Sequence, residues 1–246
     1  MEPSISIVIP VYNEGDAVVP LLDAIFETVT HSLEVLVVYD IPEDTTAPVV
    51  QAYAESEPRV CPTLNTYGRG PANAIRFGLD HVSSQVAVVM MADGSDDPTQ
   101  IDELAAPVLE GDAVIGVASR YMRGGRQLGG PFLKRSLSRL AGLSLYFIAR
   151  VGTHDATNSF KAYSTAFVRA VGIESQGGFE IGIEMVAKAR RARLPVIEIP
   201  TTWRDRVRGK SNFRLAAWIP SYLKWYIYAF GPARSPGQIA TEPWSG

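Results

Sequence analysis

VVMMADGSDDP, residues 88–98, decides how the rest of this chain is understood, because an apolar run there ends abruptly in acidic residues. The β-branched and methionine residues predict a buried strand that carries acidic side chains to its carboxyl end, the edge where open α/β sheets bind ligands. Asp97 and Pro98 then predict the start of a helix, with Asp97 as its N-cap and Pro98 at the first helical position. The sequence therefore places a polar turn between a central strand and a helix.

The other polar residues of this turn are candidates for ligand binding: Asp93, Ser95 and Asp96. Carboxylates beside an anionic ligand usually need a cation between them, and hard oxygen ligands favour Mg²⁺ or Mn²⁺. We therefore expect a divalent metal here, with Asp93 as its principal ligand. The alternative is an acidic turn that only caps the helix.

Strands and helices are expected to alternate along the first 120 residues. The strands fall at residues 4–11, 33–38, 60–65, 86–91 and 113–118, and the helices at 16–30, 47–54, 71–82 and 98–109. This alternation predicts a doubly wound, mostly parallel α/β sheet whose polar strand ends share one edge. The first strand is not followed by G-x-G-x-x-G, and the sequence contains no P-loop motif, so dinucleotide-binding and P-loop folds are disfavoured.

The second half of the chain is helical and basic. We expect a helix over 132–151, a polar loop over 155–161, a helix over 178–194, an edge strand over 196–200 and a basic loop over 204–214. Residues 215–232 form an aromatic-rich segment, either an interfacial membrane helix or an amphipathic helix packed on the domain. We therefore expect one domain over 1–214, this segment, and a disordered tail over 233–246.

Charge is distributed unevenly, although the net charge is only −3. Residues 1–58 hold eleven acidic residues and no Lys or Arg, whereas residues 120–139 hold six basic residues and no acid. This layout indicates a site where a cation meets an anionic substrate. The basic and aromatic interleaving of nucleic-acid-binding modules is missing, so we expect no nucleic-acid partner. A single cysteine and the lack of an 18-residue apolar run favour a cytoplasmic protein, at most peripheral on the membrane.

With these residues assembled, the chain resembles family 2 glycosyltransferases of the GT-A fold, and most of all the dolichyl- and polyprenyl-phosphate hexose (mannose) synthases. The resemblance covers about residues 4–214. It rests on the P-V-Y-N-E motif at residues 10–14 and on further matches at Asp40, Asp44, Asp93, Ser119-Arg120, 134–139, 155–161 and Arg206-x-x-Gly209-x-Ser211.

The resemblance implies an inverting enzyme that moves a hexose from a nucleotide-diphosphate sugar to a polyprenyl- or dolichyl-phosphate, or to a similar acceptor. It implies that the donor nucleotide is bound by Pro10, Val11, Tyr12, Asn13, Glu14 and Asp40. It assigns the acceptor phosphate to Arg120, Lys134, Arg135, Ser138, Arg206, Lys210 and Ser211, and the chemistry to Asp93, Asp155 and Arg206. Structural alternatives exist: Asn13 and Glu14 could cap a helix, Arg120 could pair with an acid, and Asp155 could be a helix cap.

Two positions depart from the family pattern. The first carboxylate of the D-x-D motif is Met91 here, and a thioether is a poor ligand for Mg²⁺, so the metal site would be weaker or rebuilt with Ser95, Asp96 and water. The D-D-G-S after the second strand reads Tyr39-Asp40-Ile41-Pro42, which affects recognition of the nucleotide base.

Two other functions compete with this interpretation. A nucleotidyltransferase would also combine an α/β sheet with acidic metal ligands, but it needs a Gly-rich, basic loop after the first strand, and residues 12–15 lack one. A non-catalytic nucleotide-sugar-binding module at the membrane surface is the third possibility, and Met91 is its main support.

Overall fold

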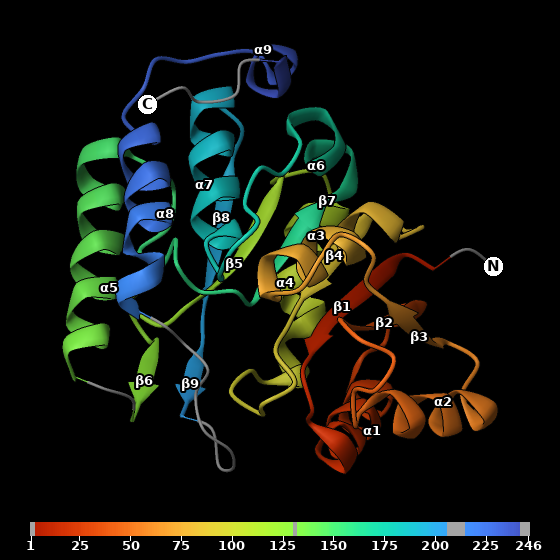
Figure 1. Ribbon diagram of the computed structural model, residues 1–246. Coiled ribbons are helices and arrows are strands. Elements are labelled where there is room, and N and C mark those ends of the chain that lie inside the picture. Colours follow the sequence, from red (N-terminus) through yellow and green to blue (C-terminus); the bar gives the residue numbers. More distant parts are fainter. Residues whose placement is uncertain (1–2, 130–131, 206–214, 242–246) are drawn as a thin grey trace.

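A seven-stranded sheet forms the centre of the computed structural model, which describes residues 3–129, 132–205 and 215–241, without the side chains of 132–135 and 215–218. The strand order is β3-β2-β1-β4-β7-β5-β8. The strands are β1 (Ile5–Val11), β2 (Leu33–Tyr39), β3 (Val60–Leu64), β4 (Val86–Val89), β5 (Ile115–Ser119), β7 (Lys161–Ser164) and β8 (Val196–Pro200). Helices cover both faces of the sheet (Figure 1), as the alternating sequence pattern predicts. A second, small sheet pairs β6 (Arg126–Leu128) with β9 (Thr202–Arg204).

The large sheet is parallel except for β7, which runs antiparallel between β4 and β5. The sequence did not predict β7, because four residues that begin with a lysine are too short to show a strand periodicity. Ala162 lies opposite both Val88 of β4 and Gly116 of β5, so the small centre of β7 fits between two tightly packed strands. The mostly parallel sheet is confirmed, and β8 is its edge strand as expected.

The sheet divides the apolar core into two clusters, one on each of its faces, and helices cover both. The helices are α1 (Val19–Thr28), α2 (Ala47–Ser56), α3 (Pro71–His81), α4 (Ile101–Leu109), α5 (Phe132–Ser144), α6 (Thr165–Val171), α7 (Ile181–Ala192), α8 (Leu215–Tyr228) and α9 (Pro236–Thr241). Short 3₁₀ turns precede α1 and α4 (Gly15–Val18 and Pro98–Gln100), and α5 continues into a π-helical turn (Leu145–Ala149). One cluster contains residues of α3, α6, α7 and α8, and the other contains residues of α1, α2 and α4. The sheet is therefore buried on both sides, which explains its continuous apolar strands.

The C-terminal segment forms α8, which packs on the domain with one face buried and the other exposed. Trp225 of α8 is 1% exposed, and its Nε1 donates a hydrogen bond to Ser175 Oγ at 3.0 Å. Residues 236–241 form α9, so the expected disordered tail is not found over this stretch. Ile239 supplies the reason, because it is buried against the cluster that contains α6 and α7.

Candidate active site

The carboxyl end of β4 carries the acidic turn that the sequence singled out. Asp97 caps the following helical turn as predicted, because its Oδ1 accepts a hydrogen bond from the backbone N–H of Thr99 at 3.0 Å. Asp93 is half-buried, and its Oδ1 accepts a hydrogen bond from the backbone N–H of Ser95 at 3.1 Å. Helix capping therefore occupies Asp97, while Asp93 lies separately at the edge of the sheet.

Asp96 is buried beneath this turn. Its side-chain Oδ2 accepts a hydrogen bond from the backbone N–H of Met91 at 2.9 Å. Burial raises the pKa of Asp96 to about 7; the nearby Asp93 adds to the rise, and the Met91 N–H, Arg120 and Lys161 oppose it. Arg120 follows β5 and Lys161 begins β7, so charged groups from three adjacent strands influence one another at this edge.

The acidic turn fits a metal ion that a nucleotide brings with it. Among the described residues, no group of three or more His, Cys, Asp and Glu side chains could hold a metal ion. Mg²⁺ commonly binds through one or two carboxylates and takes its remaining ligands from substrate phosphates and water. Asp93 can supply one such carboxylate, whereas Met91 is partly buried against the apolar cluster of α3 and α7 and carries a soft thioether. The residues present therefore fit a cation bound jointly by Asp93 and a diphosphate.

The P-V-Y-N-E motif spans the end of β1 and the loop after it, and two residues that follow β2 fix this loop. Asn13 has a positive φ of 55°, and its backbone N–H donates hydrogen bonds to both carboxylate oxygens of Asp44 at 3.0 and 3.1 Å. Thr46 Oγ1 accepts hydrogen bonds from the backbone N–H groups of Glu14 and Gly15. Glu14 occupies the N-cap position of the next helical turn, but its side chain makes no capping hydrogen bond. Helix capping therefore does not explain why a glutamate stands in this motif.

Asp40 joins the end of β2 to the loop that precedes α3. Its Oδ1 accepts a hydrogen bond from Asn65 Nδ2 and its Oδ2 from the backbone N–H of Gly70, both at 2.8 Å. Gly70 has a φ of 117°, a conformation that side chains rarely adopt. The carboxyl ends of β1 and β2 thus lie at the same edge of the sheet as Asp93. This edge contains the switch point between β1 and β4, where the connections that leave the two strands run in opposite directions along the sheet, to β2 and to β5.

Arg120 and Asp155 form a buried ion pair at the carboxyl end of β5, which β7 separates from β4 in the sheet. Arg120 Nε and Nη2 donate hydrogen bonds to the two oxygens of Asp155 at 2.7 and 2.8 Å, and the backbone N–H of Arg120 donates to the same carboxylate at 3.0 Å. Burial opposes ionisation of Asp155, but the attraction and hydrogen bonds of Arg120 outweigh it and lower the pKa of Asp155. Arg120 does pair with an acid, and Asp155 fixes the direction of its guanidinium group.

Lys161 is a buried lysine that the sequence did not single out. Its Nζ donates hydrogen bonds to the backbone carbonyls of Ala156, at 3.1 Å, and of Asn158. Burial lowers the pKa of Lys161 to about 7; Asp155 and Asp96 oppose this change, and Arg120 strengthens it. The only available signal was a lysine at the start of an apolar stretch, which is indistinguishable from a surface residue without knowledge of β7.

The remaining candidates for binding the acceptor phosphate are described only in part. Ser138 of α5 makes a hydrogen bond with Thr157 Oγ1 at 2.6 Å, and Arg120 Nη2 donates to the same atom at 3.4 Å, which brings Ser138 close to the ion pair. Lys134 and Arg135 belong to α5, but their side chains are outside the described part of the structure. Arg206, Lys210 and Ser211 lie outside the described residues altogether, so their predicted contribution stays a prediction.

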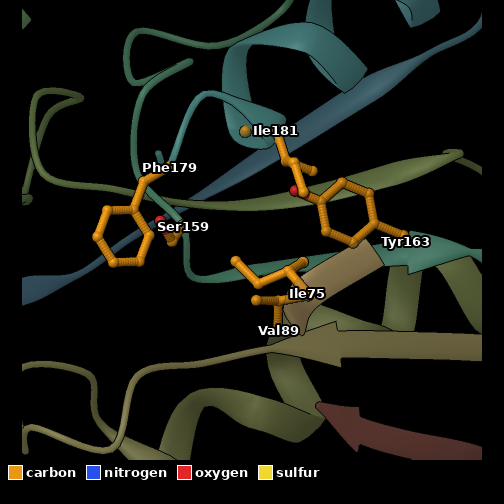
Figure 2. Close-up of a pocket in the computed structure, with 7 residues that line it drawn as sticks. Ile75, Val89, Ser159, Tyr163, Phe179 and Ile181 are labelled. Carbon is orange, nitrogen blue, oxygen red and sulfur yellow. The ribbon is translucent and has the colours of Figure 1, made fainter. Parts of the chain in front are cut away.

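A small, mainly apolar pocket lies next to this charged cluster. It is lined by Ile75, Val89, Ser159, Tyr163, Phe179, Ile181 and Gly182. Figure 2 shows Val89 of β4, Tyr163 of β7, Ile75 of α3 and Ile181 of α7 converging with the loop residues Ser159 and Phe179. Val89 is the last residue of β4, so the pocket lies near the start of the acidic turn.

Comparisons with known proteins bear on the family of this chain. The family model described as Glycosyl transferase family 2 matches residues 6–172. The chain is 31% identical over 213 residues to an undecaprenyl-phosphate mannosyltransferase of Micrococcus luteus. The alignment covers 83% of this chain and 85% of that protein. It is 28% identical over 228 residues to a polyprenol monophosphomannose synthase of Mycolicibacterium smegmatis, with 86% and 85% covered.

Solved structures support the fold. Glucosyl-3-phosphoglycerate synthase from Mycobacterium tuberculosis, in complex with Mn²⁺, uridine diphosphate and glucosyl-3-phosphoglycerate, superposes with a TM-score of 0.67. The alignment covers 95% of this chain and 82% of that one at 18% sequence identity. At this level of identity the likeness establishes the shared architecture.

Proposed function

Since this chain belongs to glycosyl transferase family 2, we propose that it transfers a hexose, with inversion, from a nucleotide-diphosphate sugar to the phosphate of a polyprenyl-phosphate. The observation that carries the proposal is the similarity, over 83% and 86% of the chain, to two enzymes whose names refer to undecaprenyl phosphate and to polyprenol monophosphomannose. The charged cluster around Asp93, Arg120 and Asp155 supports it, because the reaction brings two phosphate-bearing substrates together.

The donor nucleotide would lie over the ends of β1 and β2. Asp44 and Thr46 hold the backbone N–H groups of residues 13–15, so the backbone of the loop after β1 is fixed before a ligand arrives. Asp40 would contact the nucleotide and at the same time stabilise the loop that ends at Gly70. Preorganisation of this kind lowers the conformational cost of binding.

A divalent cation, Mg²⁺ or Mn²⁺, would be held by Asp93 and the donor diphosphate, with Ser95 and water completing its surroundings. Such an ion supplies Lewis-acid stabilisation of the departing nucleoside diphosphate. Asp93 orients the diphosphate at the end of β4. Structures of the neighbouring glucosyl-3-phosphoglycerate synthase contain Mn²⁺ or Mg²⁺, which supports a divalent ion in this fold.

The acceptor phosphate would approach from the side of Arg120. A phosphate oxygen of the acceptor attacks the anomeric carbon, a new carbon–oxygen bond forms, and the bond to the nucleoside diphosphate breaks on the opposite face. The attacking oxygen is already ionised at neutral pH, so no strong general base is required. Arg120 would orient that oxygen and offset its charge, because a guanidinium held by Asp155 has a fixed direction.

A lipid acceptor also calls for contact with a membrane surface. We define the α5–α8 face by exposed apolar side chains of these two helices and their C-terminal ends: Leu137, Leu140, Phe147, Ile148, Ile219, Leu223, Ile227 and Phe230. The helices lie side by side in Figure 1, and Ser144 Oγ lies 2.9 Å from Tyr226 Oη, which joins them. No helix among the described residues is long and apolar enough to span a bilayer. The proposal is that the α5–α8 face rests on the lipid surface, with its apolar side chains in the headgroup region.

Transfer can be tested with purified protein, polyprenyl phosphate, Mn²⁺ and a panel of radiolabelled nucleotide sugars. Label should enter the organic phase with one donor and should be absent when Asp93→Asn replaces the wild type. If no donor labels the lipid while the protein still binds nucleotides in a thermal-shift screen, the catalytic proposal is wrong.

The lipid contact has its own test. The wild type should sediment with anionic liposomes. The variant Leu223→Glu/Ile227→Glu, which changes two residues of the α5–α8 face, should stay in the supernatant. Leu64→Glu is a matched control, because Leu64 is 39% exposed on β3 at the far edge of the sheet. Equal sedimentation of the three proteins would contradict a role for this face.

A further inference from the structure

Glu198, on the edge strand β8, holds the turn that precedes Asp155. Its Oε2 accepts hydrogen bonds from Thr153 Oγ1 at 3.0 Å and from the backbone N–H of His154 at 2.8 Å. Its Oε1 lies 2.5 Å from His154 Nδ1. One carboxylate thus makes three contacts with two consecutive residues, which is more than packing of an edge strand requires.

The hydrogen bonds of Glu198 lead on, through Thr153, to the guanidinium group of Arg120. Thr153 is fully buried, and its Oγ1, which donates to Glu198, accepts a hydrogen bond from the backbone N–H of Asp155 at 3.0 Å. Asp155 in turn binds Arg120 through both of its oxygens. A continuous hydrogen-bonded path therefore leads from Glu198 to Arg120.

α5 closes this turn from the other side. A Cβ atom at Gly142 would lie 2.1 Å from the backbone oxygen of His154, so only glycine permits this approach. The ring of Tyr146 stacks on the ring of His154 with their centroids 3.6 Å apart. The turn is therefore held between β8 and the helix that contributes Ser138 to the site.

The geometry assigns Glu198 a positioning role: through Thr153 and the His154 backbone it fixes the turn from which Asp155 orients Arg120. The kinetic consequence rests on the proposed function, in which Arg120 meets the acceptor phosphate. The conformational consequence does not depend on it, because the path ends at a hydrogen bond within the protein, from the Arg120 backbone N–H to Asp155.

Hydrogen exchange of the Arg120 backbone amide, followed by NMR, tests the path directly. Glu198→Ala should accelerate this exchange at least tenfold, and Glu198→Gln should restore it, because an amide oxygen can accept the same bonds from Thr153 and the His154 backbone. Thr153→Val, which keeps the side-chain shape, provides a second route if Glu198→Ala fails to fold, and it should accelerate the same amide.

Glu34→Ala is the matched control. Glu34 Oε1 also accepts three hydrogen bonds, from Ser6 Oγ, the Ser83 backbone and Ser83 Oγ, but it contacts none of the residues on the path. Loss of this carboxylate should leave the Arg120 amide protected. If Thr153→Val leaves the amide protected, or if Glu34→Ala exposes it equally, the path from Glu198 does not exist.

Kinetics then separate this inference from the proposed function. Glu198→Ala should raise KM for polyprenyl phosphate at least fivefold and leave donor nucleotide binding unchanged, and Glu198→Gln should recover most of the loss. A wild-type protein that transfers no sugar refutes the proposed function, and the exchange experiment still decides the role of Glu198. A Glu198→Ala protein with faster exchange and an unchanged KM would refute the kinetic part.

Discussion

Arg120 donates hydrogen bonds to the carboxylate of Asp155 from Nε, from Nη2 and from its backbone N–H, at distances between 2.7 and 3.0 Å. Asp155 is fully buried, so the direction of the guanidinium group is set within the protein before a substrate binds. Asp155 accepts from only some of the side-chain donors of Arg120, since a guanidinium group carries five N–H donors. The pair that could have been a purely structural contact therefore also suits a phosphate-binding arginine.

Breaking this pair should separate stability from activity. Asp155→Ala leaves a buried guanidinium without its partner and should lower the free energy of unfolding by about 3–5 kcal/mol. Arg120→Met/Asp155→Leu removes both charges and should recover much of that stability while transfer stays lost. Urea unfolding followed by circular dichroism and a transfer assay measure the two effects. Appreciable transfer by the double variant would rule out a catalytic contribution of Arg120.

Asp93 and Asp97 lie four residues apart in the same turn and have different expected roles. Asp93→Asn should abolish metal-dependent transfer and weaken Mn²⁺ binding in the presence of nucleoside diphosphate, with the fold unchanged. Asp97→Ala should cost about 1 kcal/mol of stability through loss of the helix cap and should keep the transfer rate. Electron paramagnetic resonance reports bound Mn²⁺. A wild-type rate for Asp93→Asn at saturating Mn²⁺ would show that Asp93 is not the principal ligand.

Met91→Asp tests the departure from the family's acidic motif. A second carboxylate adds an anionic oxygen ligand, so the Mn²⁺ concentration for half-maximal activity should fall. Met91 is partly buried against the apolar cluster, so the variant should also lose some stability. Met91→Leu keeps the apolar contact and serves as the control. An unchanged or higher Mn²⁺ requirement for Met91→Asp would mean that position 91 faces the core and not the cation.

Lys161 makes stability depend on pH above neutrality. Burial lowers the pKa of Lys161 from 10.5 to about 7, so between these values the unfolded chain binds a proton that the folded protein does not. The resulting penalty is complete below pH 7 and fades as the pH rises towards 10.5. Wild type should therefore gain stability between pH 7 and 9.5 relative to Lys161→Met, by at most about 3 kcal/mol. Parallel pH profiles for the two proteins, measured by urea unfolding, would show that the buried amine does not titrate there.

The Arg206 loop remains a prediction from the sequence. Arg206→Ala should raise KM for the acceptor or lower kcat, with little effect on donor binding. Loss of a charge-assisted contact to phosphate should cost about 2–3 kcal/mol in kcat/KM, which is roughly thirtyfold to more than a hundredfold. Steady-state kinetics with each substrate varied in turn provide the measurement. Weaker donor binding, with an unchanged acceptor KM, would place Arg206 at the nucleotide instead.

The sequence predicted most of the sheet because its parallel strands are long, apolar and separated by periodic helices. It also located Asp97 as a cap and Asp93 at a strand end, because both follow from local rules at one turn. It missed β7, since a four-residue strand between a polar loop and a short helix carries little periodicity.

The tertiary contacts of the site were beyond local patterns. Nothing near Asp155 in the sequence shows that Arg120, 35 residues earlier, would occupy its carboxylate. The roles of Lys161 and Glu198 depend on residues of other segments of the chain, and the burial of Ile239 depends on α6 and α7. Such residues become visible only when the fold brings their partners together.

The acceptor is the most direct test of the account. Initial rates should be compared for polyprenyl phosphate, for the matching polyprenol without phosphate, and for 3-phosphoglycerate, with the same labelled nucleotide sugar and Mn²⁺. The account predicts transfer to polyprenyl phosphate alone, because both the lipid chain and the phosphate are needed to reach and engage Arg120. Transfer to 3-phosphoglycerate at an equal or higher rate, or transfer to polyprenol, would contradict it.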